Sequence, residues 1–226
     1  MGNLKIFGHK NPDLDSVAAT AGLSHLLQIR DGITCDMLVL GEFNKEVKYV
    51  FDKFNITLEL PIASKLEDGD NVALVDHNEF SQSISNIENA KIKMVVDHHK
   101  IDNFKTVEPL EYIAKPLGST STILYQLLKE INGLDNEEVN ILLLSAIISD
   151  TLLFKSPTTT KEDIKAAKEL AEKLNIDVDV YGLELLKAGA DLSEVLPDEL
   201  IQMDSKEFDC NRIKDWDFSN KCSWFK

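Results

Sequence analysis

Short apolar runs alternate with segments of helical periodicity along the first half of the chain. Residues 4–7 form an apolar run typical of a buried strand, and residues 16–29 carry apolar side chains at helical spacing. The further predicted strands are residues 36–40, 72–75 and 92–96. Between them, residues 46–54 and 81–86 are helical or turn-rich. This rhythm predicts βαβ units, and hence an α/β, Rossmann-like fold with a mostly parallel sheet of about five strands flanked by helices.

From residue 119 onward the pattern becomes helical. The predicted helices are residues 122–131, 137–148, 161–174, 180–188 and 198–203. Residues 139–148 are apolar almost all round, which predicts a helix buried on every side, with Asp150 inside the molecule or at a cleft. Residues 209–226 show no clear period and hold both tryptophans and two of the three cysteines. We therefore expect one domain over residues 1–208 and an atypical tail at 209–226 that is not a domain.

Charge and cysteine content narrow the possible partners and the compartment. The chain has 24 Lys and Arg against 39 Asp and Glu, a net charge of −15, which repels nucleic acid and anionic lipid. Three cysteines without a CxxC pair indicate a reducing compartment. No apolar run approaches the ~18 residues of a membrane helix, and no signal peptide is recognisable. We expect a cytoplasmic protein with neither a nucleic-acid nor a membrane partner.

Four of the five histidines stand near carboxylates. These groups are His9 with Asp13 and Asp15, His77 directly after Asp76, and His98 and His99 directly after Asp97. Each group follows a predicted strand, so all three are expected at the carboxyl edge of the sheet, where open α/β folds place ligands. Asp150 is expected to join them, because a buried carboxylate is costly without a cation or several donors.

Taken singly, each of these groups has a simpler interpretation. Asp13 or Asp15 is a favoured helix N-cap, and Asn11 followed by Pro12 makes an ordinary turn. The groups at 76–79 and 98–99 are each compatible with solvated turns. Their combination favours a metal centre, because independent turns have no reason to pair acid and imidazole repeatedly at strand ends.

The ligand types indicate the metal. The candidate ligands are His9, Asp13, Asp15, Asp76, His98 and Asp150. Four carboxylates and two imidazoles without a thiolate suit Mn²⁺, with Co²⁺ or Mg²⁺ as rivals. Six side chains suit two ions ~3.5–4 Å apart, with Asp76 as the candidate bridge. Such a pair activates water for hydrolysis of a phosphoanhydride or a phosphoester.

An anionic substrate also needs cationic or N–H groups. Lys206 and Lys155 are candidates, although for each one a solvated surface lysine is the simpler interpretation. The segment 118–120, directly before a predicted helix, offers backbone N–H donors for phosphate, although its Ser and Thr are also ordinary caps.

Several motifs resemble a known family. Residues 9–16 (HKNPDLDS) and 97–99 (DHH) resemble the DHH phosphoesterase superfamily. Within it, the motifs at 8–15, 76–79, 149–150, 155–158 and 187–191 resemble manganese-dependent (family II) inorganic pyrophosphatases. The likeness runs from about residue 3 to Phe208, which identifies residues 1–208 as a DHH catalytic domain.

The resemblance implies specific roles. His9, Asp13 and Asp76 would hold one Mn²⁺, and the ligands of the other would be Asp15, Asp76, His98 and Asp150. His99 would contact the phosphate and protonate the leaving group, and Lys206 would bind phosphate. Asp97 would orient its neighbours. The implied reaction is hydrolysis of pyrophosphate to two phosphates, with Mg²⁺ accompanying the substrate, by a homodimer joined through the N-terminal domain.

The chain also departs from the family pattern. Family members continue into a second α/β domain whose Ser-Arg-Lys motif grips the substrate, and the tail after Phe208 does not match it. Metal binding with weak or absent turnover is therefore expected. One alternative is another DHH phosphodiesterase acting on short oligonucleotides or cyclic dinucleotides, which the net charge and the 76–79 motif oppose. The other is a non-catalytic metal-binding or dimerisation fragment.

Overall fold

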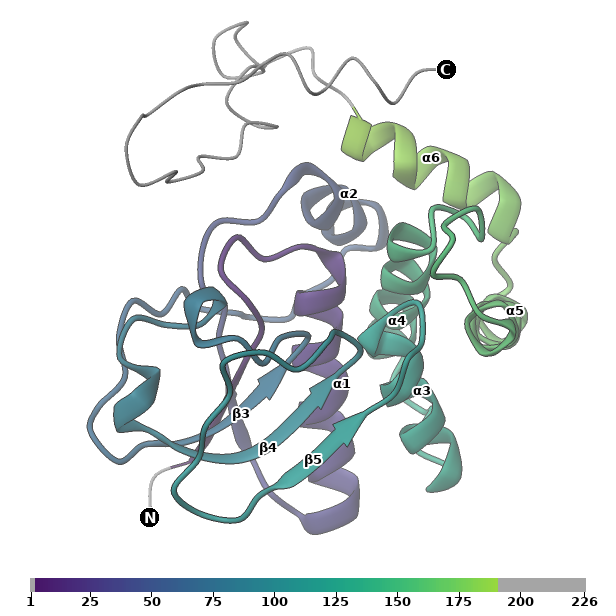
Figure 1. Ribbon diagram of the computed structural model, residues 1–226. Helices are drawn as coiled ribbons and strands as arrows, with labels where there is room; N and C mark the ends of the chain where they lie inside the picture. Colours follow the sequence, from purple (N-terminus) through teal and green to yellow (C-terminus); the bar gives the residue numbers. More distant parts are fainter. Residues whose placement is uncertain (1–2, 191–226) are drawn as a thin grey trace, which may run out of the picture. The chain divides into compact units, whose positions relative to one another are not determined.

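A parallel sheet forms the centre of the fold. The computed structural model describes residues 3–190. The sheet has the strand order β2-β1-β3-β4-β5, and every neighbouring pair is parallel. Figure 1 shows β3, β4 and β5 side by side and pointing in the same direction. The strands are β1 (Leu4–Phe7), β2 (Cys35–Met37), β3 (Asn71–Val75), β4 (Lys91–Asp97) and β5 (Glu111–Ala114). The predicted α/β class with a mostly parallel sheet is confirmed.

Helices connect the strands and follow the sheet. They are α1 (Leu14–Asp31), α2 (Lys45–Phe54), α3 (Thr120–Glu130), α4 (Glu137–Asp150), α5 (Lys161–Leu174) and α6 (Val178–Ala190). The predicted helix at 161–174 has the observed bounds, and the others described lie within a few residues of their predictions. The predicted helix at 198–203 and the domain boundary at 208 lie outside the described residues. None of the described helices is long and apolar enough to cross a membrane.

The sequence pattern did not reveal β5, and it overestimated β2. β5 pairs with β4 at the edge of the sheet, where Tyr112 and Ile113 are only half-buried and the two end residues are exposed. A short edge strand of this kind carries no apolar run. β2 ends at Met37, and beyond it Val39 and Leu40 make only isolated bridges.

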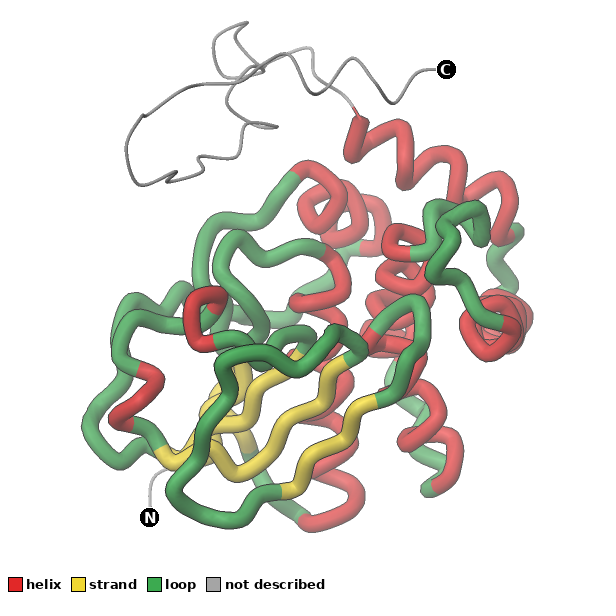
Figure 2. The backbone as a smooth tube through the Cα atoms, viewed as in Figure 1, coloured by secondary structure: helices red, strands yellow, loops and turns green. Residues whose placement is uncertain are grey.

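The two faces of the sheet are covered differently. Helices pack on one face, whereas loops and two 3-10 turns, Phe80–Gln82 and Ile87–Asn89, cover the other (Figure 2). Because side chains alternate along a strand, Ile6 faces the helical core and Phe7 the loop-covered core. The segments that carry His9, His77, His98 and His99 directly follow the carboxyl ends of strands β1, β3 and β4, so they lie at that edge of the sheet.

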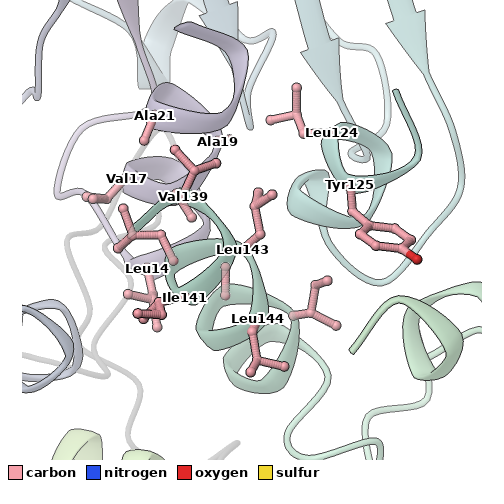
Figure 3. Packing of buried hydrophobic residues seen from close by; sticks show 14 of the residues in the cluster. Leu14, Val17, Ala19, Ala21, Leu124, Tyr125, Val139, Ile141, Leu143 and Leu144 are labelled. Atoms are coloured by element: carbon pink, nitrogen blue, oxygen red, sulfur yellow. The ribbon is translucent and has the colours of Figure 1, made fainter. Parts of the chain in front are cut away.

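α4 is the central helix of the helical core. Residues 139–148 are buried all round, as their apolar sequence predicts. Figure 3 shows α4 packed against α1 and α3, with Val17, Leu124 and Leu143 among the contacting side chains. Gly22 permits this close approach, since a Cβ there would lie 3.2 Å from Leu143 and 3.3 Å from Leu124. The packing fixes the end of α4, and with it Asp150, next to the start of α1.

Candidate metal centre

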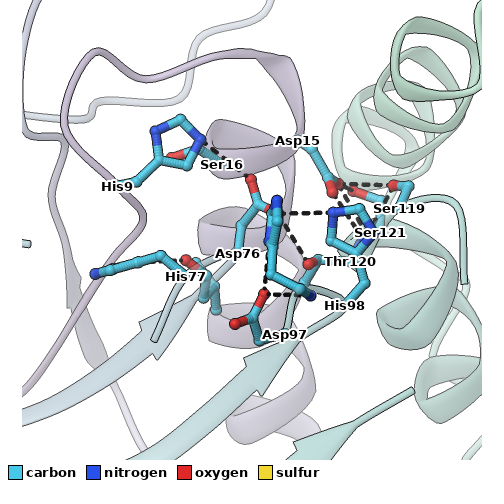
Figure 4. A network of polar contacts seen from close by, with 12 residues as sticks. His9, Asp15, Ser16, Asp76, His77, Asp97, His98, Ser119, Thr120 and Ser121 are labelled. Atoms are coloured by element: carbon cyan, nitrogen blue, oxygen red, sulfur yellow. Dashed lines mark hydrogen bonds and ion pairs between the residues drawn. The ribbon is translucent and has the colours of Figure 1, made fainter. Parts of the chain in front are cut away.

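Polar side chains from the ends of three strands and from helices gather at the carboxyl edge of the sheet, and Figure 4 shows His9, Asp15, Asp76 and His98 among them. Strands β1, β3 and β4 are neighbours, and they lead into His9, Asp76 and Asp97 with the histidines that follow it. Asp15 lies in the first turn of α1, and Asp150 is the last residue of α4. The parallel register brings these segments together although they are far apart in the sequence.

Asp76 lies at the centre of this cluster. Its side chain is buried, with Oδ2 3.4 Å from Nε2 of His9 and Oδ1 3.6 Å from Nε2 of His98. Its backbone has φ of +58°, a left-handed conformation that Asp adopts more readily than most residues. Burial raises the pKa of Asp76, and the charge of Asp15 raises it further. A buried carboxylate under these conditions is ionised only when a cation compensates it.

The ring of His9 lies between two carboxylates. Its Nδ1 donates to the carbonyl oxygen of Lys10 at 2.8 Å, so in the neutral ring Nε2 carries the free lone pair. That Nε2 is 3.3 Å from Oδ2 of Asp13 and 3.4 Å from Oδ2 of Asp76. Burial alone would lower the pKa of His9, but hydrogen bonds to the two carboxylates and their charges raise it to about 11. The position therefore needs a positive charge, which a proton or a metal ion supplies.

Asp13 serves two purposes through its two oxygens. Oδ1 accepts the backbone N–H of Ser16 at 2.9 Å and caps α1, while Oδ2 faces His9. The capping interpretation of this residue is therefore correct, and it does not compete with membership of the cluster.

His98 and His99 enter the cluster by different routes. Nδ1 of His98 donates to the carbonyl oxygen of Leu117 at 3.0 Å, which directs Nε2 toward Asp76. Nδ1 of His99 lies 2.9 Å from Oδ1 of the fully buried Asp97. This hydrogen bond raises the pKa of His99. The His99 side chain is 51% exposed, so a ligand can reach the ring from solvent.

Asp15 and Asp150 complete the cluster on the side of the helices. Asp15 is fully buried and accepts hydrogen bonds from the start of α3, the nearest of them from the backbone N–H of Thr120 at 2.6 Å and the hydroxyl of Ser121 at 2.5 Å. Burial raises the pKa of Asp150 well above its usual value, and so do the charges of Asp15 and Asp76. The carboxylates of Asp15, Asp76 and Asp150 repel one another when they are ionised, unless a cation lies between them.

The described part of the chain contains three groups of residues that could hold a metal ion. Within each group, the possible ligand atoms lie within 4.8 Å of one another. The groups are His9 with Asp13 and Asp76, Asp76 with His98 and His99, and Asp15 with His98 and Asp150. The structure thus brings all six predicted ligands together and adds His99. Carboxylate and imidazole donors without thiolate fit a divalent metal ion of the Mn²⁺ type.

Comparisons with known proteins agree with this geometry. The family model "DHH family, N-terminal domain" matches residues 3–152. The chain is 49% identical over 209 residues to the "Probable manganese-dependent inorganic pyrophosphatase" of Oceanobacillus iheyensis, and 46% identical over 208 residues to the "Manganese-dependent inorganic pyrophosphatase" of Bacillus subtilis. Each alignment covers 92% of this chain and 67% of the relative. The chain belongs to the manganese-dependent inorganic pyrophosphatases of the DHH family.

A solved structure of this family has the same fold. The "Crystal structure of Methanococcus jannaschii putative family II inorganic pyrophosphatase" matches with a TM-score of 0.79 at 40% sequence identity. The match covers 92% of this chain and 68% of that protein. The chain thus spans about two thirds of the length of the relatives that it matches.

The two lysines predicted to bind phosphate stay predictions. Lys206 is outside the described residues, and Lys155 is exposed. The prediction that segment 118–120 donates to phosphate is wrong for two of its N–H groups. The N–H of Gly118 donates to Asp163 at 2.9 Å and that of Thr120 to Asp15 at 2.6 Å, because buried carboxylates already lie within reach.

Sequence reasoning missed the groups that hold the candidate ligands. Hydroxyls at the start of α3 and at its N-cap reach Asp15 and Asp76. The amide of Asn78 donates at 2.6 Å to Asp97, which in turn holds His99. Asn78 stands in the 76–79 motif, which marked the segment as part of the site but did not indicate what Asn78 does there. Ser119 and Thr120 looked like ordinary helix caps, and only the tertiary packing shows which carboxylate each hydroxyl reaches.

Proposed function

We propose that this domain hydrolyses inorganic pyrophosphate to two phosphates at a centre of two Mn²⁺ ions. His9, Asp13 and Asp76 would hold one ion. The ligands of the other would be Asp15, Asp76, His98 and Asp150. The observation that carries the proposal is the orientation of Asp76, which has one oxygen facing His9 and the other facing His98. A carboxylate directed to two sides is the ligand that a two-ion centre shares.

The donor set also explains how an acidic protein binds a polyanion. Divalent ions held by these residues would lower the pKa of bound water and would neutralise phosphate oxygens. With a net charge of −15, the rest of the chain supplies no comparable attraction. In this proposal Mn²⁺ is the resident ion, Co²⁺ or Mg²⁺ can replace it, and Mg²⁺ enters with the substrate.

His99 is the proposed acid for the leaving phosphate. Asp97 holds its Nδ1 at 2.9 Å and raises its pKa, so the ring is protonated over a wider pH range. The half-exposed ring can then donate from Nε2 to the bridging oxygen as the P–O bond to the attacked phosphorus breaks. Lys206, which lies outside the described residues, is proposed to bind phosphate. We further propose a cytoplasmic homodimer.

Phosphate release tests the proposal directly. The full chain loaded with Mn²⁺ is expected to release phosphate from pyrophosphate, at a low rate because the tail after Phe208 does not match the substrate-gripping domain of the family, and metal analysis is expected to find two ions per chain. A cyclic dinucleotide and a short oligonucleotide serve as competing substrates. Faster cleavage of either one would identify a phosphodiesterase instead, and no release from any of the three would identify a non-catalytic metal-binding domain.

A further inference from the structure

The first turn of α3 is directed at two of the candidate metal ligands. Asp15 accepts hydrogen bonds from the hydroxyl of Ser119 at 2.8 Å and from both the N–H, at 2.9 Å, and the hydroxyl of Ser121. Thr120 contacts both carboxylates, because its N–H donates to Asp15 and its hydroxyl donates to Oδ1 of Asp76 at 3.0 Å (Figure 4).

Burial makes these contacts strong. The side chains of Ser119, Thr120, Ser121 and Asp15 are fully buried, and Asp76 is 2% exposed. Water therefore does not compete for the donors, and a hydrogen bond from a neutral group to a carboxylate is stronger here than at the surface. The α3 turn is thus a fixed support for both carboxylates.

Thr120 has the most specific position in this support. Its hydroxyl holds Oδ1 of Asp76 on the side of Asp15 and His98, which leaves Oδ2 of Asp76 facing His9. Its N–H, on the same residue, holds Oδ2 of Asp15. One residue therefore fixes both the separation of the two carboxylates and the rotation of the shared one.

We propose that Thr120 is a positioning residue that orients Asp76 toward two ions at once and thereby sets the affinity of the centre for Mn²⁺. This inference rests on the proposed function, since it assigns a role within the same centre. Hydrogen-bonded partners of metal ligands commonly change metal affinity by about 10- to 100-fold when they are replaced. Without the hydroxyl, the Asp76 carboxylate is free to rotate away from the shared orientation.

Replacing Thr120 by valine tests this role with little change of shape. Thr120→Val keeps the N–H that donates to Asp15 and removes only the hydroxyl that donates to Asp76. Calorimetric titration of the full-length, metal-free chain with Mn²⁺ is expected to show affinity about 10- to 100-fold below that of the unmodified chain. Thr120→Ser, which restores a hydroxyl, is expected to recover most of it.

Thr122→Val is the matched control. Thr122 lies on the same helix and is fully buried, and its hydroxyl also donates to a buried carboxylate, Asp163, at 2.6 Å. The Thr122→Val variant is expected to lose stability as Thr120→Val does, but to keep the Mn²⁺ affinity of the unmodified chain. If Thr120→Val does not fold, Thr120→Ala, which removes the hydroxyl without adding bulk, takes its place.

The outcomes separate this inference from the proposed function. Failure of the unmodified chain to bind two Mn²⁺ would overturn the proposed centre and this inference with it. Normal binding by the unmodified chain together with unchanged affinity in the Thr120 variants would overturn only the positioning role. Equal losses of affinity in Thr120→Val and Thr122→Val would likewise overturn it, because the effect would then be a general loss of helix packing.

Discussion

Asn78 donates a hydrogen bond from its side-chain amide to Oδ2 of Asp97 at 2.6 Å, and both side chains are buried. The same amide donates to the carbonyl oxygen of Lys100 at 2.8 Å, and its oxygen accepts the N–H of Asp102 at 2.9 Å. Asn78 therefore ties the segment after β3 to the segment after β4. Because Asp97 in turn holds His99, this tie fixes the proposed acid indirectly.

We expect Asn78→Ala to weaken both the fold and the reaction. Loss of a buried group with three partners costs about 1–3 kcal/mol of unfolding free energy, measured by denaturant titration. Phosphate release is expected to fall by up to about 100-fold, the lower range of what a positioned acid contributes. Asn86→Ala is the control, because Asn86 also ties two loop segments, through Leu66, but lies outside the cluster. Equal loss of activity in both variants would refute the positioning role.

Metal stoichiometry distinguishes the shared ligand from the proposed acid. Asp76→Ala removes the carboxylate that faces both His9 and His98, so we expect fewer than two Mn²⁺ per chain. His99→Ala removes a half-exposed ring that the proposal leaves without a metal, so two ions are expected to remain. Equilibrium dialysis followed by metal analysis gives both values. Equal stoichiometry in the two variants would contradict the assignment.

Mn²⁺ is expected to stabilise the folded chain by mass action. A ligand that binds only the native state at 100 times its dissociation constant adds about 2.7 kcal/mol, which for a domain of this size raises the melting temperature by about 5–10 °C. Thermal unfolding with Mn²⁺ and with a chelator measures the difference. Asp76→Ala is the control and is expected to show little shift. The absence of a shift in the unmodified chain would argue against a preformed centre.

The pKa of Asp150 predicts an unusual pH dependence for the metal-free chain. Burial and the charges of Asp15 and Asp76 raise this pKa in the folded state above its value in the unfolded chain. The folded chain therefore binds the Asp150 proton more tightly than the unfolded chain does. The stability that this gives is fully present below the pKa of the unfolded chain, about 4, and is lost as the pH rises through the pKa of the folded chain. Asp150→Asn removes this dependence. Melting temperatures of both chains are measured in chelator over a range of pH. The value for the variant minus the value for the unmodified chain is expected to increase with pH, and a constant difference would contradict the raised pKa of Asp150.

The positions of the candidate ligands followed from the sequence, but the groups that orient them did not. The rule that parallel strands present their carboxyl ends at one edge was sufficient to bring His9, Asp76 and His98 together. The hydroxyl contact between Ser119 and Asp15 joins residues 104 positions apart, and it depends on how α3 packs against α1. No local pattern carries that information. β5 was missed for a related reason, because its half-buried residues are stabilised by pairing with β4 rather than by an apolar run.

Gly8 controls the position of His9 through a close approach between β1 and α1. A Cβ at residue 8 would lie 1.9 Å from the hydroxyl oxygen of Ser16 and 2.8 Å from its Cβ, so Gly8→Ala must move the loop away from the helix. We expect a loss of about 1–3 kcal/mol of unfolding free energy from overpacking. Because His9 follows directly, its distances to Asp13 and Asp76 change, and Mn²⁺ affinity is expected to fall in calorimetric titration.

Gly32→Ala separates this local displacement from a general loss of stability. Gly32 ends α1 with φ of +67°, and no atom would lie within 4 Å of a Cβ placed there. The substitution strains a left-handed backbone at the far end of the same helix and costs about 1 kcal/mol. We expect Gly32→Ala to lower the melting temperature while leaving Mn²⁺ affinity unchanged. If it weakens Mn²⁺ binding as much as Gly8→Ala does, the effect arises from the stability of α1 and not from the position of His9.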